Sequence, residues 1–211
     1  MSATCGICKS PKAKRSCPVE GEICPQCCGR DREETIDCPV DCEFLIESRL
    51  HAKPGPLDRS LNPDLNPSEE FVKSNHPLFM VAAIGLLGAA LESPTCVDRD
   101  LEDCLDAAIR NRRTRRSGLI YDARPDNAVA AAILEIFDAR LEEFRAESAK
   151  WDGYRSPSEA DVLTMLAFLR MAAGSNNSGR RKSRAFLHFL MSYAANELPP
   201  EGEEPAGRLI V

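Results

Sequence analysis

Eight of the ten cysteines fall within the first 42 residues, and their types and spacing suit metal-thiolate chemistry. Two C-x-x-C pairs, at 5–8 and 24–27, are typical of tight turns that each present two sulfurs to one ion. The other four cysteines of this segment are Cys17, Cys28, Cys38 and Cys42. The sequence therefore predicts a metal-binding module at residues 1–53, and no comparable set of catalytic side chains stands out elsewhere.

The spacing favours two closed four-sulfur sites. The first would combine Cys5, Cys8, Cys24 and Cys27, because the fifteen residues between the two pairs match the length of a hairpin, as in a zinc ribbon. The second would take Cys17, Cys28, Cys38 and Cys42; Cys38 and Cys42 share a face if the chain is helical there. An alternative groups Cys5, Cys8, Cys27 and Cys28 against Cys17, Cys24, Cys38 and Cys42. We prefer the first grouping because the side chains of adjacent cysteines point apart.

Eight thiolates fill two structural sites, so we expect two Zn²⁺ ions per chain and no open coordination position. Iron in the same sulfur field, an iron–sulfur cluster and eight unliganded thiols are the alternatives. Segment 1–53 has few large apolar residues and would not normally fold unaided. A structural zinc site contributes on the order of 10–16 kcal/mol, enough to supply the missing stability.

The sequence predicts a cellular compartment in which cysteine thiols stay reduced and available to bind metal. The N-terminus lacks a charged stretch followed by an apolar core, so we predict no secretory signal and a cytoplasmic location. The longest apolar run, 78–91, would span roughly 21 Å as a helix, which is short of a hydrocarbon core of about 30 Å. We expect that run to be a buried helix.

Beyond the module we predict a proline-rich linker at 54–67, an α-helical bundle at 68–198 and an acidic tail at 199–211. Four prolines in the linker exclude a regular helix. Apolar side chains at helical spacing then predict five or six amphipathic helices that share one core. The expected N-caps are Ser68, Asn75, Asp126 and Ser156, and Gly174 is the expected end of the helix that Ser156 opens. The fold class is mainly α, with a small binuclear cysteine module.

Two basic segments are candidates for phosphate contacts, although the chain carries a net charge of −6. They comprise Arg110, Arg112, Arg113, Arg115 and Arg116 in the first segment, and Arg180, Arg181, Lys182 and Arg184 in the second. Together they would form a patch for nucleic acid if they faced the same way. Acidic residues precede the first segment, and neither segment contains base-stacking aromatic residues, which favours solvated faces instead.

Two smaller features remain. Tyr121, Asp122 and Arg124 place a phenol, a carboxylate and a guanidinium in one connector, which is a candidate site or simply a loop with paired charges. Cys96 and Cys104 lie outside the module, and we expect them to be small buried hydrophobic residues rather than a redox pair.

Three stretches also carry a resemblance: ICPQCCG at 23–29, IDCPVDCEFL at 36–45 and SGLIYDARP at 117–125. They resemble a group of uncharacterised bacterial proteins with an N-terminal zinc-finger-like region followed by a helical region. The resemblance implies that the cysteines are metal ligands. For Tyr121, Asp122 and Arg124 it implies membership of the group and no functional role. It implies no activity.

The leading functional hypothesis is a non-enzymatic protein-interaction or scaffold protein that acts as a subunit of a larger assembly. The metallated module would be acidic, which favours a protein partner over nucleic acid. A nucleic-acid-binding regulator that uses the two arginine-rich segments is the second hypothesis. An enzyme with a site near Tyr121 is the third. The sequence does not predict the oligomeric state.

Overall fold

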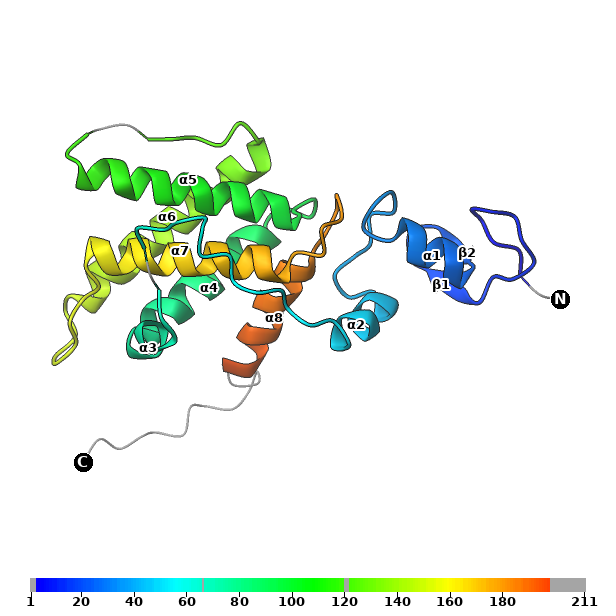
Figure 1. The fold of residues 1–211 in the computed structure, drawn as a ribbon, viewed down its shortest axis with the longest axis horizontal. Helices are drawn as coiled ribbons and strands as arrows, with labels where there is room; N and C mark the ends of the chain where they lie inside the picture. Colours follow the sequence, from blue (N-terminus) through cyan, green and yellow to red (C-terminus); the bar gives the residue numbers. More distant parts are fainter. Residues whose placement is uncertain (1–2, 66, 120–121, 198–211) are drawn as a thin grey trace, which may run out of the picture.

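The computed structural model describes residues 3–65, 67–119 and 122–197, and it places a small cysteine-rich part and a helical part at opposite ends of an elongated molecule (Figure 1). This arrangement confirms the predicted fold class. The predicted tail at 199–211 and Tyr121 of the connector lie outside the described residues.

The cysteine-rich part begins with a hairpin of β1 (Arg15–Cys17) and β2 (Gly21–Ile23), which are antiparallel. Gly21 begins β2 with a φ of 70°, a conformation that costs glycine little. Two short helices follow, α1 (Pro25–Asp31) and α2 (Glu43–Leu50). Among the residues described in this part, three aliphatic side chains are buried, Ile23, Ile36 and Leu45, and the rest of the buried interior is cysteine.

The helical part contains six helices among the described residues. They are α3 (Glu69–Ser74), α4 (His76–Leu91), α5 (Asp98–Arg116), α6 (Ala128–Ser148), α7 (Glu159–Asn176) and α8 (Ala185–Glu197). Helix α5 packs against α6 and α7, and α4 packs against α6, α7 and α8. The shared core has fully buried leucines and phenylalanines from five of these helices, among them Leu86, Leu105, Phe137, Leu166 and Phe186. The apolar periodicity thus produces the predicted bundle.

Of the caps predicted for the first two helices of the bundle, α3 and α4, only one is confirmed. Ser68 caps α3, because its hydroxyl accepts from the backbone N–H of Phe71. Asn75 precedes α4, but its side chain does not cap that helix. It donates instead to the carbonyl of Phe71, which closes α3.

Two later caps lie one or two residues from the predicted positions. Asn127, not Asp126, caps α6 by accepting from the N–H of Val129. Ser158, not Ser156, caps α7 in a reciprocal capping box with Asp161.

Helix α7 also runs beyond the predicted end at Gly174 and stops at Asn176. Its last turn thereby includes Ser175, whose carbonyl accepts from the N–H of Gly55 in the chain that follows α2.

A buried ion-pair network joins three helices of the bundle. Arg112 of α5 is fully buried, and its guanidinium donates to Asp138 and Glu142 of α6 and to Glu159 of α7. A charge in such a position is tolerated because several carboxylates satisfy it. The network fixes α5 against α6 and α7.

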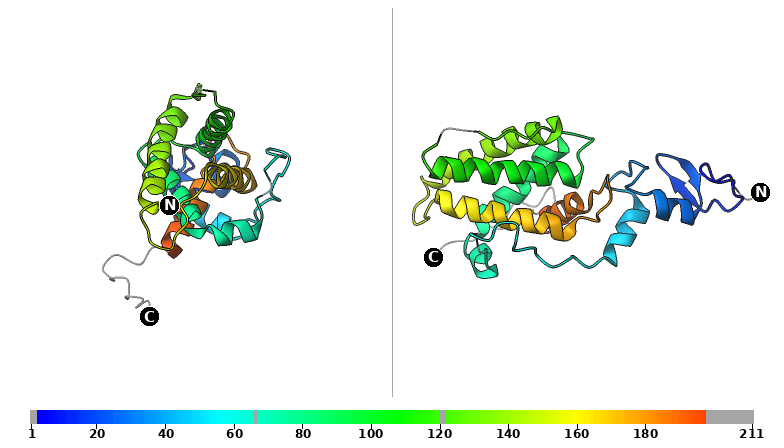
Figure 2. Two further views of the ribbon diagram at one scale, coloured as in Figure 1. Left: turned by 90° about the vertical axis from the view of Figure 1, so that its left-hand side faces the viewer. Right: turned by 45° about the horizontal axis from the view of Figure 1, so that its top comes forward.

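The chain between α2 and α3 runs along the surface of the bundle (Figure 2). Gly55 donates its N–H to the carbonyl of Ser175 at 2.8 Å, Asn62 is buried, and Asp64 pairs with Arg113. This segment therefore follows the bundle and does not project from it.

No helix in the described part of the chain has the length and apolar character needed to span a bilayer. The apolar run predicted to be a buried helix is α4, and its leucines and alanines pack against α6, α7 and α8.

Candidate metal centre

The first C-x-x-C pair forms a tight turn that rests on the hairpin. The N–H of Lys9 donates to the carbonyl of Cys5 at 2.9 Å, and Lys9 has a φ of 59°. Gly6 donates to the carbonyl of Glu22 at 2.8 Å, and a Cβ at Gly6 would lie 3.1 Å from the carbonyl oxygen of Glu20. Glycine at this position therefore allows the turn to approach the hairpin closely.

The second pair begins a helix. Cys24 is the N-cap of α1, and its sulfur accepts from the N–H of Cys27 at 3.4 Å. Pro25 occupies the first helical position, which needs no N–H donor. The N–H of Cys24 in turn donates to the sulfur of Cys5 at 3.3 Å, so backbone donors link the two turns.

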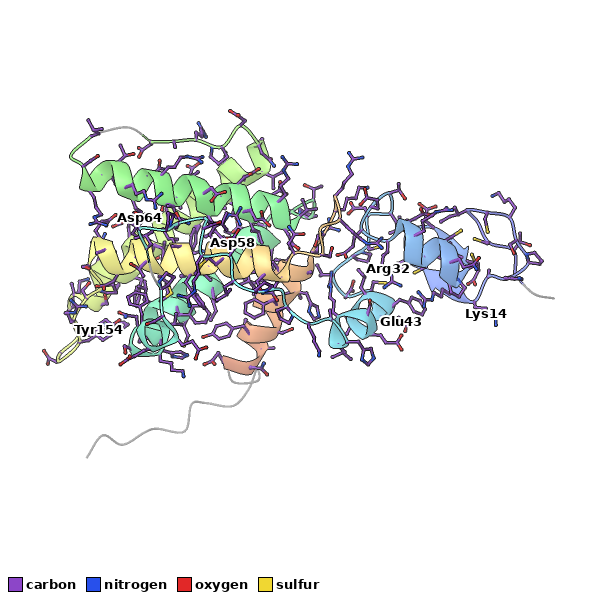
Figure 3. The ribbon with its side chains drawn as sticks, viewed as in Figure 1. Lys14, Arg32, Glu43, Asp58, Asp64 and Tyr154 are labelled. Carbon is purple, nitrogen blue, oxygen red and sulfur yellow. The ribbon has the colours of Figure 1, made fainter. Side chains whose placement is uncertain are left out.

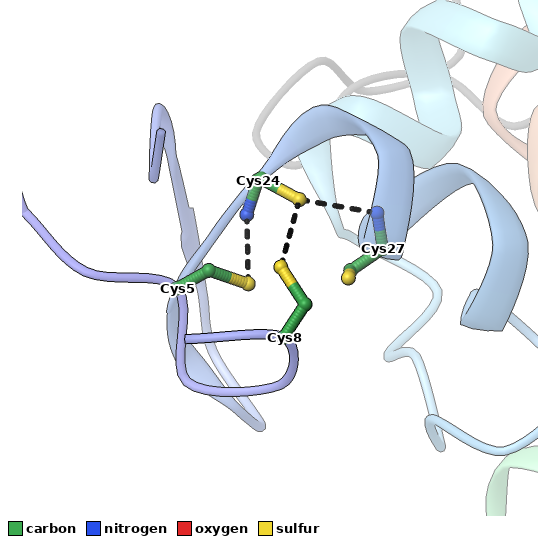
Figure 4. A group of neighbouring side chains, drawn as sticks. All are labelled: Cys5, Cys8, Cys24 and Cys27. Atoms are coloured by element: carbon green, nitrogen blue, oxygen red, sulfur yellow. Dashed lines mark hydrogen bonds between the residues drawn. The ribbon is translucent and has the colours of Figure 1, made fainter. Parts of the chain in front are cut away.

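These two turns bring four sulfurs to one point (Figure 4). The Sγ atoms of Cys5, Cys8, Cys24 and Cys27 all lie within 4.8 Å of one another, and those of Cys8 and Cys24 are 3.8 Å apart. A tetrahedral zinc site with bonds of about 2.3 Å requires sulfurs roughly 3.8 Å apart, whereas a disulfide requires about 2.05 Å. The four side chains therefore fit a single metal ion and not disulfides, and none of the ten cysteines is in a disulfide.

This group matches the preferred pairing and not the alternative. Cys28 follows Cys27 directly, but its sulfur accepts from Nη1 of Arg15 at 3.1 Å and does not belong to the cluster. The helical geometry of α1 sends adjacent side chains in different directions, as the sequence argument assumed.

The surroundings of the four thiols differ. The backbone N–H of Cys8 and other backbone donors lower the pKa of Cys5 to about 6, and the N–H of Cys27 lowers the pKa of Cys24. Burial raises the pKa of Cys27 to about 12. Donors to sulfur favour the thiolate form that a metal ligand requires, and a bound cation would supply the same stabilisation to Cys27.

The second predicted site is not assembled in the same way. Among the described residues, the cluster of Cys5, Cys8, Cys24 and Cys27 is the one group with metal-ligand spacing, so Cys17, Cys28, Cys38 and Cys42 do not reach such spacing. Cys38 and Cys42 were expected on one helical face, but α2 begins only at Glu43 and the segment between them is irregular. The i, i+4 argument therefore does not apply to them.

The second basic segment, 180–184, contacts the cysteine-rich part instead of forming a free surface. The guanidinium of Arg180 donates to the carbonyls of Gly29, Arg30 and Arg32 at 3.0, 3.1 and 2.6 Å, at the end of α1. Nζ of Lys182 donates to the carbonyl of Thr35 at 3.0 Å. Arg180 thus binds the C-terminal end of a helix, where cations are favoured, and Lys182 binds the turn that follows it.

Arg184 is the most buried member of that segment, with 4% of its surface exposed. Its guanidinium donates to the carbonyls of Cys38 and Cys96 and to the carboxylate of Asp37. The predicted phosphate contact is therefore wrong for Arg184, because the side chain is enclosed between the two parts of the protein.

The first basic segment, 110–116, is also largely paired. Arg112 is fully buried in its ion-pair network, so the predicted phosphate contact is wrong there too. Arg113 pairs with Asp64, and Arg115 lies 3.4 Å from Asp122. Four basic residues of the two segments remain exposed: Arg110, Arg115, Arg116 and Arg181. With Arg112 and Arg184 buried, the two segments do not form the continuous patch that nucleic-acid binding would require.

The connector candidate and the remaining cysteines follow the simpler interpretations. Asp122 is exposed and paired with Arg115, while Arg124 is exposed, and Tyr121 is outside the described residues. Cys96 and Cys104 are buried; burial raises the pKa of Cys96 to about 12 and also raises that of Cys104. Neither thiol has the low pKa of a reactive cysteine.

Two buried carboxylates that the sequence argument did not single out have different roles: Glu33 links the two parts of the protein, and Asp98 joins α5 to the start of α8 within the bundle. Glu33 is 3% exposed and accepts from Nη2 of Arg49 at 2.7 Å and from the N–H of Arg184 at 2.9 Å. Asp98 is fully buried and accepts from the hydroxyl of Ser183 and from the N–H groups that open α8, including that of Phe186. No local pattern identifies either role, because every partner comes from a distant segment.

Comparison with known proteins adds no identification. No protein-family model, no curated protein and no solved structure matches this chain.

Proposed function

We propose that this chain is a zinc-binding, non-enzymatic protein-interaction protein, and a subunit of a larger assembly. The observation that carries the proposal is the convergence of four sulfurs, those of Cys5, Cys8, Cys24 and Cys27, within 4.8 Å of one another. Four thiolates saturate a tetrahedral ion, so such a centre stabilises a fold and leaves no position for a substrate or an activating water.

Zinc is the metal that this donor set favours. It prefers a tetrahedral arrangement of thiolates, and the sulfur separation of 3.8 Å between Cys8 and Cys24 agrees with bonds of about 2.3 Å. Iron in the same sulfur field is the competing assignment, and its visible absorption distinguishes it from colourless zinc.

A second zinc ion belongs to the same proposal. It would require Cys17, Cys28, Cys38 and Cys42 to approach one another. All four pack within or against the small interior of the cysteine-rich part, Cys28 and Cys38 inside it and Cys17 and Cys42 against it. The segment between Cys38 and Cys42 would have to move, and it is not held in a helix, because α2 starts after it.

Several arginines that could have bound nucleic acid are instead paired within the molecule, which favours protein interaction over nucleic-acid binding. Arg180 and Arg184 of the second basic segment bind backbone carbonyls and Asp37 within the molecule, and Arg112 is enclosed in the bundle. A zinc ion with four thiolates also adds a formal charge of about −2 to the cysteine-rich part. Both facts weaken attraction to phosphate backbones.

The test is native mass spectrometry of the freshly purified full chain, with elemental analysis and identification of proteins that co-purify. We expect at least one zinc per chain, no bound nucleic acid and one stoichiometric protein partner. The variant Cys24→Ser should lose the ion, whereas Cys104→Ala should retain it, because Cys104 lies in the bundle core.

Three results would contradict parts of this proposal. Wild-type protein without zinc would remove the metal assignment, and iron in its place would change the metal. Zinc-loaded protein that binds heparin or nucleic acid tightly, with loss on substitution of the exposed Arg115 and Arg116, would replace protein interaction with the regulator hypothesis.

A further inference from the structure

A cleft of about 700 Å³ lies where the cysteine-rich part meets the bundle. One wall comes from α1, α2 and the residues that follow α2, and the other from the end of α7 and from α8. Arg32 spans the first wall: it donates to the carbonyl of Cys28 in α1 and to that of Phe44 in α2 (Figure 3). A cleft of this size matches the volume of typical small-molecule sites.

The lining is strongly cationic. Arg32, Arg49, Lys53 and Arg180 line it, and Glu33 is the one acidic residue among its lining residues. The formal surplus is thus about three positive charges, in a chain whose net charge is −6. Because like charges repel, such a concentration in an acidic protein points to a ligand of opposite charge.

The lining carboxylate leaves most of this charge uncompensated. Among the described residues, Glu33 is the one carboxylate that forms an ion pair with these four cations, at 2.7 Å from Nη2 of Arg49. Glu33 also accepts from the N–H of Arg184. The guanidinium groups of Arg32 and Arg180 donate to backbone carbonyls, which are dipoles and not full negative charges.

Arg49 provides the most specific signal. Its Nε and Nη1 atoms are buried and have no hydrogen-bond partner, although Nη2 is satisfied by Glu33. Buried donors without partners are uncommon and costly in folded proteins. A planar guanidinium binds oxyanions in a bidentate manner once its donors face them, which here requires the Arg49 side chain to turn toward the cleft that it lines.

The rest of the lining is suited to a small organic ligand. Leu45, Leu50 and Phe189 supply apolar surface, and Ser48, Ser178 and Ser192 supply hydroxyl groups. His188 also lines the cleft; burial, and to a lesser extent the charge of Arg49, lowers its pKa, so the neutral ring adds no charge of its own.

We propose that this cleft binds a small molecule that carries a phosphate group, with the phosphate at Arg49 and the organic part against Phe189. A phosphate monoester carries nearly two negative charges at neutral pH and three acceptor oxygens, which suits a surplus of about three positive charges better than a single carboxylate does.

The experiment is isothermal titration of the full, zinc-loaded chain with phenyl phosphate at low ionic strength, with inorganic phosphate and benzoate as comparison ligands. We expect phenyl phosphate to bind more tightly than either, because only it combines a dianion with an apolar group. Higher salt should weaken all binding.

The decisive variant is Ser48→Asp, with Ser48→Asn as its matched control. Ser48 is exposed at the cleft and takes no part in the pairing of Arg49 with Glu33, so neither change removes a buried contact. The added carboxylate should weaken phenyl phosphate binding by about tenfold or more through repulsion and competition for the cations. The asparagine variant should bind within about twofold of wild type.

A second variant tests the unpartnered donors. Arg49→Lys retains a cation near Glu33 but removes the planar fork, so phosphate binding should weaken by about threefold or more. Lys73→Gln is the control for loss of a positive charge elsewhere, because Lys73 on α3 is 80% exposed. Circular dichroism and zinc content should remain those of wild type in all four variants.

The proposal is overturned if folded wild-type protein binds none of the ligands at millimolar concentration. It is also overturned if Ser48→Asp and Ser48→Asn bind alike, or if Lys73→Gln weakens binding as much as Arg49→Lys does. Tighter binding of benzoate than of phenyl phosphate would overturn the assignment to phosphate. None of these outcomes depends on whether the metal centre holds one ion or two.

Discussion

The cysteine-rich part and the bundle are stabilised by different physical means. The bundle buries a continuous core from five long helices, in which residues such as Phe137 and Leu105 are wholly enclosed. The cysteine-rich part has three buried aliphatic residues and a group of converging sulfurs. Hydrophobic burial suffices for the first and not for the second, which is why the spacing of cysteines matters more there than hydrophobicity.

The surface between the two parts is held neither by hydrophobic burial nor by sulfur ligands. It is made of buried charges and hydrogen bonds: Arg184 enclosed between both parts, Glu33 between Arg49 and the start of α8, and Arg180 at the end of α1. Such contacts are directional, so they fix one relative orientation but contribute modest net stability.

The largest expected effect comes from removing the metal. Cys24→Ser, or a strong chelator, should unfold the cysteine-rich part, because a structural zinc site contributes on the order of 10–16 kcal/mol. The helical signal of the bundle should largely persist. Far-ultraviolet circular dichroism and hydrogen exchange of the two segments measure this difference. Equal loss of protection in both would show one cooperative unit.

The reverse experiment perturbs the bundle core. Phe137→Ala should destabilise the bundle by about 3–5 kcal/mol, because it leaves a cavity around a wholly buried ring. Zinc content should not change while the chain is folded. Denaturant titration followed by helical signal, with metal analysis of the same samples, checks both statements. Loss of zinc at denaturant concentrations where the helices persist would contradict the separation of the two parts.

An intermediate effect is expected at the surface between the parts. Arg184→Gln should cost about 3 kcal/mol, since it leaves buried carbonyls of Cys38 and Cys96 without a donor. The neighbouring Arg181→Gln removes an exposed guanidinium and should cost less than about 0.5 kcal/mol. Denaturant unfolding gives both values, and hydrogen exchange near Cys38 should rise only in the first variant.

The smallest effect is a pH dependence confined to the bundle. Burial alone would raise the pKa of Glu142, but Arg112 outweighs it and holds the pKa below its usual 4.5. The contribution to stability is therefore complete above pH 4.5 and is lost as the pH falls through the lower, folded-state value. Because Glu142 is 47% exposed, we expect less than about 1 kcal/mol.

The measurement is thermal unfolding of the helical signal between pH 7 and pH 3, in wild type and in Glu142→Gln. The variant should be less stable at pH 7, and the difference should shrink on acidification. A difference that is constant over this range would exclude the ion pair as its source.

Much of the architecture could be predicted because it depends on local patterns. Leucines and phenylalanines at helical spacing predict the helices of the bundle, and the two C-x-x-C pairs predict the first group of sulfurs. Caps were predicted less well: Asn127 replaces Asp126 because neighbouring residues with similar side chains compete for one position.

The chain's own residue order thus determined the helices and the convergence of Cys5, Cys8, Cys24 and Cys27, since spacing and short-range sterics suffice for both. Only the tertiary structure decided what the arginines of 180–184 bind, because their partners lie about 150 positions away. The sequence pattern around a charged side chain does not distinguish one that faces solvent from one that binds a buried carbonyl. Its partner is settled by packing, which brings distant segments together and excludes water between them.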